Sequence, residues 1–269
     1  MTRTDWAGVT HPVARGAVRI ASLVPSLTEL LFALDLGSSV VARTGFCVHP
    51  RPAVRKIPKI GGTKDPDLER LRALAPTHLI VNVDENRREV VEQAASFIPH
   101  VIVTHPAGPD DNPRLYRLLG AVFGRDRAAE SLCRAFEDAR DALAHAIAPL
   151  PRERVLYLIW RGPWMSVRRD TYVARTLACA GWDTVPPDAP RRYPEIADEA
   201  PAWRDADRIL LSTEPYAFRP RDADALARRH RKPVHLIDGE WTSWYGVRAI
   251  DGLRALGAYR GTLTPTVIA

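Results

Sequence analysis

Short apolar runs alternate along the first half of the chain with segments that carry a single apolar stripe. Strands are expected at 18–24, 39–42, 78–82 and 101–104. The helix after the first strand opens with Ser26-Leu-Thr-Glu29, which predicts a capping box, and further helices begin near Asp67 and Glu85. This alternation is typical of a parallel sheet whose strands are joined by crossover helices.

The next segment, from about 125 to 147, contains neither Gly nor Pro and predicts one long helix. Its apolar residues recur every three or four positions, at Leu132, Phe136, Ala139, Leu143 and Ile147. A second alternating series follows this helix. Strands are expected there at 155–160, 208–212 and 234–237, and helices at 173–180, 196–205, 222–230 and 247–257.

The two series predict an α/β protein with two small parallel-sheet α/β lobes joined by one long backbone helix. The expected parts are an N-terminal extension (1–17), an N-terminal lobe (18–124), the linking helix (125–149), a C-terminal lobe (150–260) and a tail (261–269). Ligands of parallel sheets bind beyond the carboxyl ends of the strands, so the loops at those ends are the first place to look for function.

Composition narrows the class of protein. With 46% hydrophobic and 26% charged residues, the chain of 269 residues is expected to form soluble globular domains. Its net charge of +6 is compatible with binding to nucleic acid. The basic residues are, however, scattered among acidic residues along helical segments, which is typical of helix faces exposed to water. We expect no nucleic-acid partner, no membrane insertion and a monomer.

The cysteines and the N-terminal sequence indicate the cellular compartment in which the protein is expected. Cys47, Cys133 and Cys179 are far apart and lack CxxC spacing, so no disulfide framework is predicted. Cys133 and Cys179 fall in helical apolar patterns and are interpreted as small core residues. The N-terminus shows no basic stretch followed by an apolar run and a cleavage site. As written, the chain is expected in the cytoplasm; if its N-terminus is mis-called, the periplasm is expected instead.

Aromatic residues crowd the loops that follow the expected strands of the second half. Trp241-Thr-Ser-Trp-Tyr-Gly-Val-Arg248 follows one strand, and Trp160-Arg-Gly-Pro-Trp164 follows another. Exposed rings lose free energy to water unless something covers them, so these loops indicate a site for a flat ligand, with core packing as the alternative. The candidate ligand-binding residues of this half are Trp160, Trp164, Tyr193, Tyr216, Trp241, Trp244, Tyr245 and Arg248.

In the first half, Phe46, Cys47 and His49 follow an expected strand and are further candidate ligand-binding residues. Cys47 and His49 are two positions apart, so in an extended segment both project to one side and could bind a metal, or the axial position of a metal macrocycle. Glu240 could complete such a metal site; ordinary packing and hydrogen bonding are the alternative. No nucleophile elbow or HExxH motif is present, so no catalytic residue is predicted.

The sequence resembles the helical-backbone metal receptor family, the substrate-binding proteins that serve ABC importers of vitamin B12, haem and iron siderophores. The resemblance is closest to the B12-binding branch and runs from about Arg19 to Gly257. It rests on Arg19-Ile-Ala-Ser-Leu-Val-Pro-Ser-Leu-Thr-Glu29, the turn and helix at 61–71, Leu74-Ala-Pro-Thr-His-Leu-Ile80, the long helix and the loop at 238–248. It implies a long helix that restrains hinge motion and a ligand cleft between the lobes.

The resemblance also implies roles for single residues. In the B12-binding branch, aromatic residues of both lobes hold the corrinoid, and Phe46, Tyr193 and Trp241 match those positions. Arg248 is available for a propionamide or carboxylate. The Phe46-Cys-Val-His49 sequence departs from the plainer loop of the well-known B12 receptors.

The resulting prediction is a binding protein, not an enzyme, that holds cobalamin or a similar metal-tetrapyrrole or metal chelate. Family receptors dock on an ABC permease through one surface glutamate per lobe, and Glu69 and Glu199 match those positions. Two alternatives stay open. One is a cytoplasmic metal-binding enzyme or metal-delivery factor that uses Cys47, His49 and Glu240. The other is a scaffold module whose aromatic loops contact a protein partner.

Overall fold

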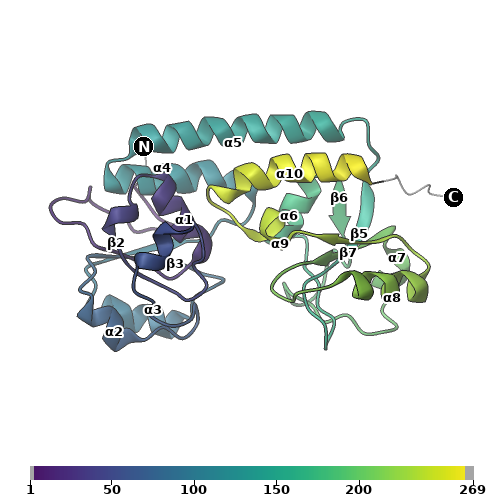
Figure 1. The fold of residues 1–269 in the computed structure, drawn as a ribbon, viewed down its shortest axis with the longest axis horizontal. Helices are drawn as coiled ribbons and strands as arrows, with labels where there is room; N and C mark the ends of the chain where they lie inside the picture. Colours follow the sequence, from purple (N-terminus) through teal and green to yellow (C-terminus); the bar gives the residue numbers. More distant parts are fainter. Residues whose placement is uncertain (1–2, 264–269) are drawn as a thin grey trace. The chain divides into compact units, whose positions relative to one another are not determined.

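The computed structural model describes residues 3–263, and the chain forms two compact units. Unit 1 comprises Met1–Pro106, Asp110–Phe136 and Tyr245–Arg248. Unit 2 comprises Ala107–Pro109, Glu137–Trp244 and Ala249–Ala269. Each unit contains one four-stranded parallel sheet with helices beside it (Figure 1), so the prediction of two parallel-sheet α/β lobes is confirmed.

Unit 1 is built on a sheet in which all neighbouring strands run parallel, in the order β2-β1-β3-β4. Its strands are β1 (Ile20–Ser22), β2 (Val40–Arg43), β3 (His78–Asn82) and β4 (His100–Thr104). Its helices are α1 (Pro25–Ala33), α2 (Leu68–Ala73), α3 (Arg88–Ala95) and α4 (Asn112–Phe123), with short 3-10 turns η1 (Gly37–Ser39), η2 (Ala53–Lys56) and η3 (Pro109–Asp111) before α4. Every residue of β3 is buried, because a central parallel strand is covered on both faces.

The segment that contains Asp5, His11 and Ala14 packs onto the rest of unit 1. The Asp5 carboxylate accepts a hydrogen bond from the Val103 N–H at 3.0 Å and lies 3.0 Å from His11 Nε2. The Ala14 N–H donates to the Val122 carbonyl at 2.8 Å. Because Val103 belongs to the edge strand β4, these contacts cover a strand edge that water or another chain would otherwise meet. The stretch expected as an N-terminal extension is therefore part of unit 1.

Unit 2 repeats the strand order of unit 1, as β6-β5-β7-β8, again with all neighbours parallel. Its strands are β5 (Glu153–Leu158), β6 (Trp182–Thr184), β7 (Arg208–Ser212) and β8 (Val234–Ile237). Its helices are α6 (Tyr172–Cys179), α7 (Pro201–Asp205), α8 (Pro220–His230), α9 (Gly239–Ser243) and α10 (Arg248–Thr262), and the long α5 (Asp126–Ile147) passes from unit 1 to unit 2 at Glu137. Within residues 3–263, no helix is both long and apolar enough to cross a membrane. Positions 264–269 of the expected tail lie outside the described residues.

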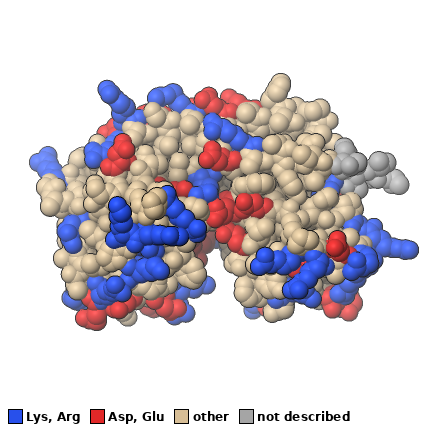
Figure 2. Space-filling view, in the orientation of Figure 1, with Lys and Arg blue, Asp and Glu red and all other residues tan. Residues whose placement is uncertain are grey.

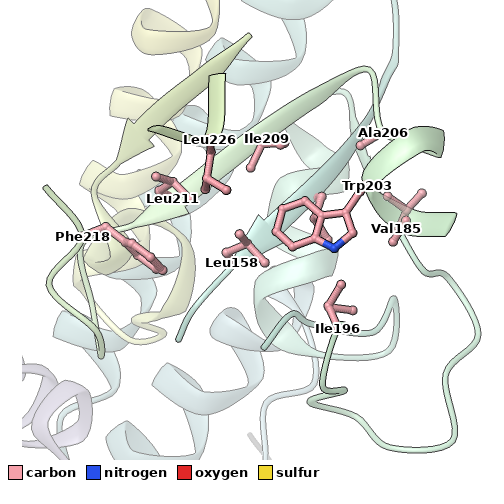
Figure 3. Packing of buried hydrophobic residues seen from close by; sticks show 11 residues of the cluster. Leu158, Val185, Ile196, Trp203, Ala206, Ile209, Leu211, Phe218 and Leu226 are labelled. Carbon is pink, nitrogen blue, oxygen red and sulfur yellow. The ribbon is translucent and has the colours of Figure 1, made fainter. Parts of the chain in front are cut away.

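One apolar core of unit 2 lies between its sheet and the helices α7 and α8 (Figure 3). Leu158 of β5 and Leu211 of β7 meet Trp203 of α7 and Leu226 of α8 there, all of them buried. Phe218, from the loop after β7, closes one end of this cluster. The loop residues near Phe218 are thus anchored in the core that also fixes the strands.

The predicted capping box at Ser26 is wrong. Val24 is the residue that precedes α1, Pro25 occupies the first helical turn, and no side chain caps the helix. Proline starts a helix well because its fixed φ suits that position and its missing N–H leaves no donor unsatisfied there. Ser26 is therefore inside the helix, and the Glu29 side chain is left to bind elsewhere.

Two further differences from the predicted elements come from proline. The helix expected at 196–205 is reduced to α7, because Pro201 keeps Ala200 extended and starts the helix after it. Helix α4 was not predicted, because Pro113 and Gly120 interrupt its pattern; Pro113, however, lies in the first turn, where proline is tolerated. Gly120 is required by packing, since an added Cβ would lie 2.6 Å from Ala129 Cβ.

The structure also contains strand β6, which the sequence pattern does not predict because the strand has only three residues.

Replacing Gly252 by Ala is expected to lower the free energy of unfolding by about 1–3 kcal/mol, the usual cost of overpacking. Gly252 lies in α10, where an added Cβ would come within 2.7 Å of the Trp241 carbonyl oxygen, a backbone atom that cannot turn aside. Gly261→Ala in the same helix is the control. An added Cβ there meets nothing within 4 Å, so a gain of up to about 1 kcal/mol is expected. Urea denaturation measures both; equal effects of the two changes would contradict the packing.

Candidate functional site

Both sheets place a topological switch point at the carboxyl ends of their central strands. In unit 2 the chain leaves β5 toward β6 on one side, then returns to β7 on the other side of β5. The connections that leave β5 and β7 therefore run in opposite directions along the sheet, and open α/β sheets bind ligands beyond the carboxyl ends of the strands at such a point. The same argument applies in unit 1 to the loops after β1 and β3.

The two loops at the switch point of unit 2 carry an aromatic pair, the exposed Trp160 and the partly buried Tyr216, which packs against the core of unit 2. Trp160 follows β5 and Tyr216 follows β7, and their rings meet edge to face with centroids 5.5 Å apart. Trp160 keeps 40% of its surface exposed. The Met165 N–H donates to the Trp160 carbonyl at 3.1 Å and the Ile159 N–H donates to the Met165 carbonyl at 2.9 Å, and these bonds hold the first loop in a tight turn. An exposed indole on a fixed backbone can receive the face of a flat ligand without prior rearrangement.

Trp164, four positions further along the same loop, faces the other way. Its ring stacks parallel to Phe218 at 6.2 Å and meets Trp203 edge to face at 5.7 Å. Trp164 packs against the core of unit 2, so its contribution to a site is to support the pair of Trp160 and Tyr216. Tyr193, in the loop before α7, is 39% exposed.

The loop after β8 surrounds a half-buried carboxylate, that of Glu214. Its Oε1 accepts hydrogen bonds from Ser243 Oγ and from Trp244 Nε1, both at 2.8 Å. Burial raises the pKa of Glu214, and the nearby Glu240 and Asp238 raise it further against the lowering effect of these two bonds. Trp244 is therefore held by a carboxylate rather than turned outward.

Glu214→Gln is expected to make unfolding less dependent on pH. Because the folded-state pKa of Glu214 lies above the ordinary 4.5, the folded protein binds the extra proton more readily, and stability falls as pH rises through the folded-state pKa. Glutamine keeps an oxygen for Ser243 and Trp244 but carries no charge, so the variant should gain stability over the wild type between pH 4.5 and neutrality.

Urea denaturation at a series of pH values measures this effect. Glu199→Gln, a change at an exposed glutamate of the same unit, is the matched control and should leave the pH profile as it is. A Glu214→Gln protein that loses stability relative to the wild type as pH rises would contradict the assigned pKa direction.

Trp241 lies against α10. Its ring meets Tyr259 edge to face at 5.9 Å, and its backbone touches Gly252. The Tyr259 hydroxyl in turn donates to the Leu236 carbonyl of β8 at 2.6 Å. Trp241 thus ties α9 to α10, and its assignment as a ligand-binding residue stays a prediction.

In unit 1, Phe46 and Cys47 are neighbours with opposite surroundings. Phe46 is 63% exposed in the loop after β2, whereas Cys47 is 1% exposed. Thr28 Oγ1 donates to the Cys47 sulfur at 3.1 Å, and Thr44 Oγ1 lies 3.2 Å from it. Burial raises the pKa of the Cys47 thiol above 9.0, so it stays protonated at neutral pH and is a poor metal ligand.

His49 is half-buried two residues further on. Within residues 3–263, no group of three or more His, Cys, Asp or Glu side chains is placed to hold a metal ion. Cys47 and His49 lie in unit 1 and Glu240 lies in unit 2, and the metal site expected from these three residues stays a prediction.

Tyr245 and Arg248 belong to unit 1, and both are held by carboxylates. The Tyr245 hydroxyl donates to Glu85 Oε1 at 2.5 Å, and burial together with the Glu85 charge raises the pKa of Tyr245 well above 10.0. Arg248 forms a bidentate ion pair with Glu29, in which Nε donates to Oε2 at 2.9 Å and Nη2 donates to Oε1 at 2.6 Å. Sequence reasoning missed this pair, because its members are 219 positions apart and no local pattern links them.

The chain is similar to known binding proteins over most of its length. The family model described as "Periplasmic binding protein" matches residues 20–231. A vitamin B12-binding protein of Pectobacterium carotovorum subsp. carotovorum is 23% identical over 257 residues, which are 92% of this chain and 90% of that protein.

Solved structures share the fold. The periplasmic heme-binding protein of Roseiflexus sp. RS-1 in apo form has a TM-score of 0.77 at 24% identity, over 91% of this chain and 98% of that chain. The periplasmic vitamin B12-binding protein of Vibrio cholerae has a TM-score of 0.77 at 18% identity, over 90% and 96%. These names are of periplasmic proteins and do not support the cytoplasmic location expected from the sequence.

Proposed function

This chain belongs to the periplasmic binding protein family, and we propose that it binds cobalamin or a related metal-tetrapyrrole and delivers it to an ABC importer. The proposal places the protein on the periplasmic side of the membrane. Its role is to bind and hand over a ligand, so no catalytic residue is assigned. Relatives named as vitamin B12-binding and heme-binding proteins support this class of ligand.

The aromatic pair of Trp160 and Tyr216, in which Trp160 is the exposed ring, carries the proposal. It lies on the loops after β5 and β7, at the switch point where an open sheet binds its ligand. Both rings are anchored from below, since Trp164 and Phe218 of the same loops pack into the core. Little conformational entropy is lost when such rings bind the face of a macrocycle, because they are ordered before the ligand arrives.

Phe46 in unit 1 and Tyr193 in unit 2 add exposed aromatic surface on other loops. Residues that already have carboxylate partners, Arg248 and Trp244, are assigned a supporting role in this proposal. The predicted cleft shared by the two lobes stays a prediction.

Titration of the purified protein with hydroxocobalamin and with haemin tests the proposed function. The visible spectrum follows the ligand, and calorimetry gives the stoichiometry and the dissociation constant. We expect saturable binding of at least one of the two at micromolar concentration, about −8 kcal/mol. If neither binds below about 1 mM, where the binding free energy is only about −4 kcal/mol, the proposal is withdrawn.

We further propose that Glu69 and Glu199 dock the loaded protein on its permease. Both side chains are exposed, Glu69 in the first turn of α2 and Glu199 just before α7. Charge reversal of either residue to Arg should leave the affinity for the ligand unchanged but abolish stimulation of the ATPase activity of a reconstituted permease. Glu89→Arg, an exposed position in α3, is the control. Undiminished stimulation by the Glu69→Arg and Glu199→Arg proteins would reject the docking role.

A further inference from the structure

Unit 1 contains a cavity of about 330 Å³ beside β2 and η2 that is lined by four cationic side chains and by no acidic one. The cations are Arg43, Arg51, Arg55 and Lys59. Figure 2 shows several Lys and Arg side chains gathered on the visible face of unit 1. Within residues 3–263, none of these four side chains forms an ion pair.

Arg43 is the key residue, because its charge is buried. It is the last residue of β2 and is 3% exposed. Its Nε donates to the Val54 carbonyl at 2.8 Å, and its Nη1 donates to the carbonyls of Thr44 and Cys47, both at 3.0 Å. These bonds fix the guanidinium but leave Nη2 without a hydrogen-bond partner in the described part of the chain. These carbonyl oxygens accept hydrogen bonds from the guanidinium group of Arg43 but do not neutralise its positive charge.

A buried, uncompensated cation with three more cations around the same cavity is costly for the folded protein unless an anion joins it. Arg51 and Arg55 flank the start of η2 and are exposed, so they can turn toward an anion without disturbing the core. Guanidinium groups match the oxygens of phosphate in geometry and charge, which makes phosphate the oxyanion best suited to several arginines.

We propose that this cavity is a binding site for a phosphate group, separate from the aromatic pair of unit 2. Arg43 offers its remaining N–H groups from the floor of the cavity, and Arg51, Arg55 and Lys59 neutralise the charge. The cavity is at the lower end of the size range of small-molecule sites, so it has room for a small organic part attached to the phosphate.

Calorimetric titration of the full chain with inorganic phosphate and with glycerol 3-phosphate tests the site, in chloride buffer held at about 0.1 M ionic strength so that screening stays constant. We expect saturable binding of the phosphate group, and the Arg51→Gln/Arg55→Gln double variant should lose affinity at least about tenfold. Lys56→Gln is the matched control, because it removes an exposed charge from η2 that does not line the cavity. Its affinity should stay within about threefold, the effect of long-range charge alone.

The two probes separate the possible sources of the phosphate. Tighter binding of glycerol 3-phosphate assigns the site to an organic phosphate, and equal affinities assign it to the free ion. The proposal is overturned if neither probe binds below about 10 mM, or if Lys56→Gln weakens binding as much as the double variant does. Circular dichroism of each variant verifies that the exposed substitutions leave the fold intact.

Discussion

Replacing Glu153 by Ala is expected to lower the free energy of unfolding of unit 2 by about 3–5 kcal/mol. Glu153 opens β5 and is 1% exposed, and two buried arginines depend on it. Arg208 donates to both carboxylate oxygens of Glu153, from Nε to Oε2 and from Nη2 to Oε1, each at 3.1 Å. Arg260 Nη1 lies 3.2 Å from Oε2 of the same carboxylate. Removing the carboxylate takes away the counter-charge that both buried guanidinium groups bind, which costs far more than the ion pair itself contributes.

The other residues around Glu153 supply no second negative charge in the contacts described below. Trp182 Nε1 donates to the same carboxylate at 3.2 Å, and Arg208 Nη1 lies 2.6 Å from His235 Nε2. Burial and the Arg208 charge lower the pKa of His235, so at neutral pH its ring accepts a hydrogen bond and carries no charge. It therefore adds no positive charge to the cluster, and Glu153 is the single anion that these contacts share.

Urea denaturation followed by circular dichroism measures the loss. The matched control is Arg154→Gln, one position further along β5; the Arg154 side chain is 56% exposed and binds Asp207 at 2.8 Å. Because water screens the exposed Arg154, the control should lower the free energy of unfolding much less than Glu153→Ala does. A Glu153→Ala protein within about 1 kcal/mol of the wild type would show that water or rearrangement compensates the buried arginines.

The second large effect concerns ligand affinity: Trp160→Ala is expected to weaken binding of hydroxocobalamin by about ten- to a hundredfold. A tryptophan presents roughly 250 Å² in all, and the 40% left exposed here corresponds to about 100 Å². At about 25 cal/mol per Å², covering that surface contributes about 2.5 kcal/mol, which lies within this range.

The control is Trp6→Ala, which removes an indole of unit 1 that is stacked under Arg114, 4.0 Å from the ring centroid. Its ligand affinity should equal that of the wild type. Fluorescence or visible titration gives both constants. An unchanged affinity in the Trp160→Ala protein, or an equal loss in the control, would remove the aromatic pair from the site.

Local sequence patterns predict those elements whose ends are fixed by neighbouring residues. Strands β3, β7 and β8 have the expected limits, because each is a short apolar run followed by polar residues. The start of α2 also follows from sequence, since the Asp67 side chain accepts a hydrogen bond from the Arg70 N–H. Helix α4 and strand β6 depend instead on packing between distant segments, which no short pattern encodes.

The candidate site, like the fold, is predicted from sequence only in part. Sequence places aromatic residues on the loops after β5 and β8, but it does not tell which rings face outward. Trp160 and Trp164 share one loop, and only Phe218 and Trp203, distant in sequence, decide that Trp164 turns to the core. In the same way, Glu29 decides that Arg248 is paired rather than open. Burial of a loop side chain is a property of its distant neighbours.

A crystal structure of the protein grown with hydroxocobalamin tests the central claim most directly, because it shows which surface receives the macrocycle. The account predicts that a face or edge of the corrin ring covers Trp160 and Tyr216 at the ends of β5 and β7. A corrin bound to a surface that contacts neither Trp160 nor Tyr216 would contradict it.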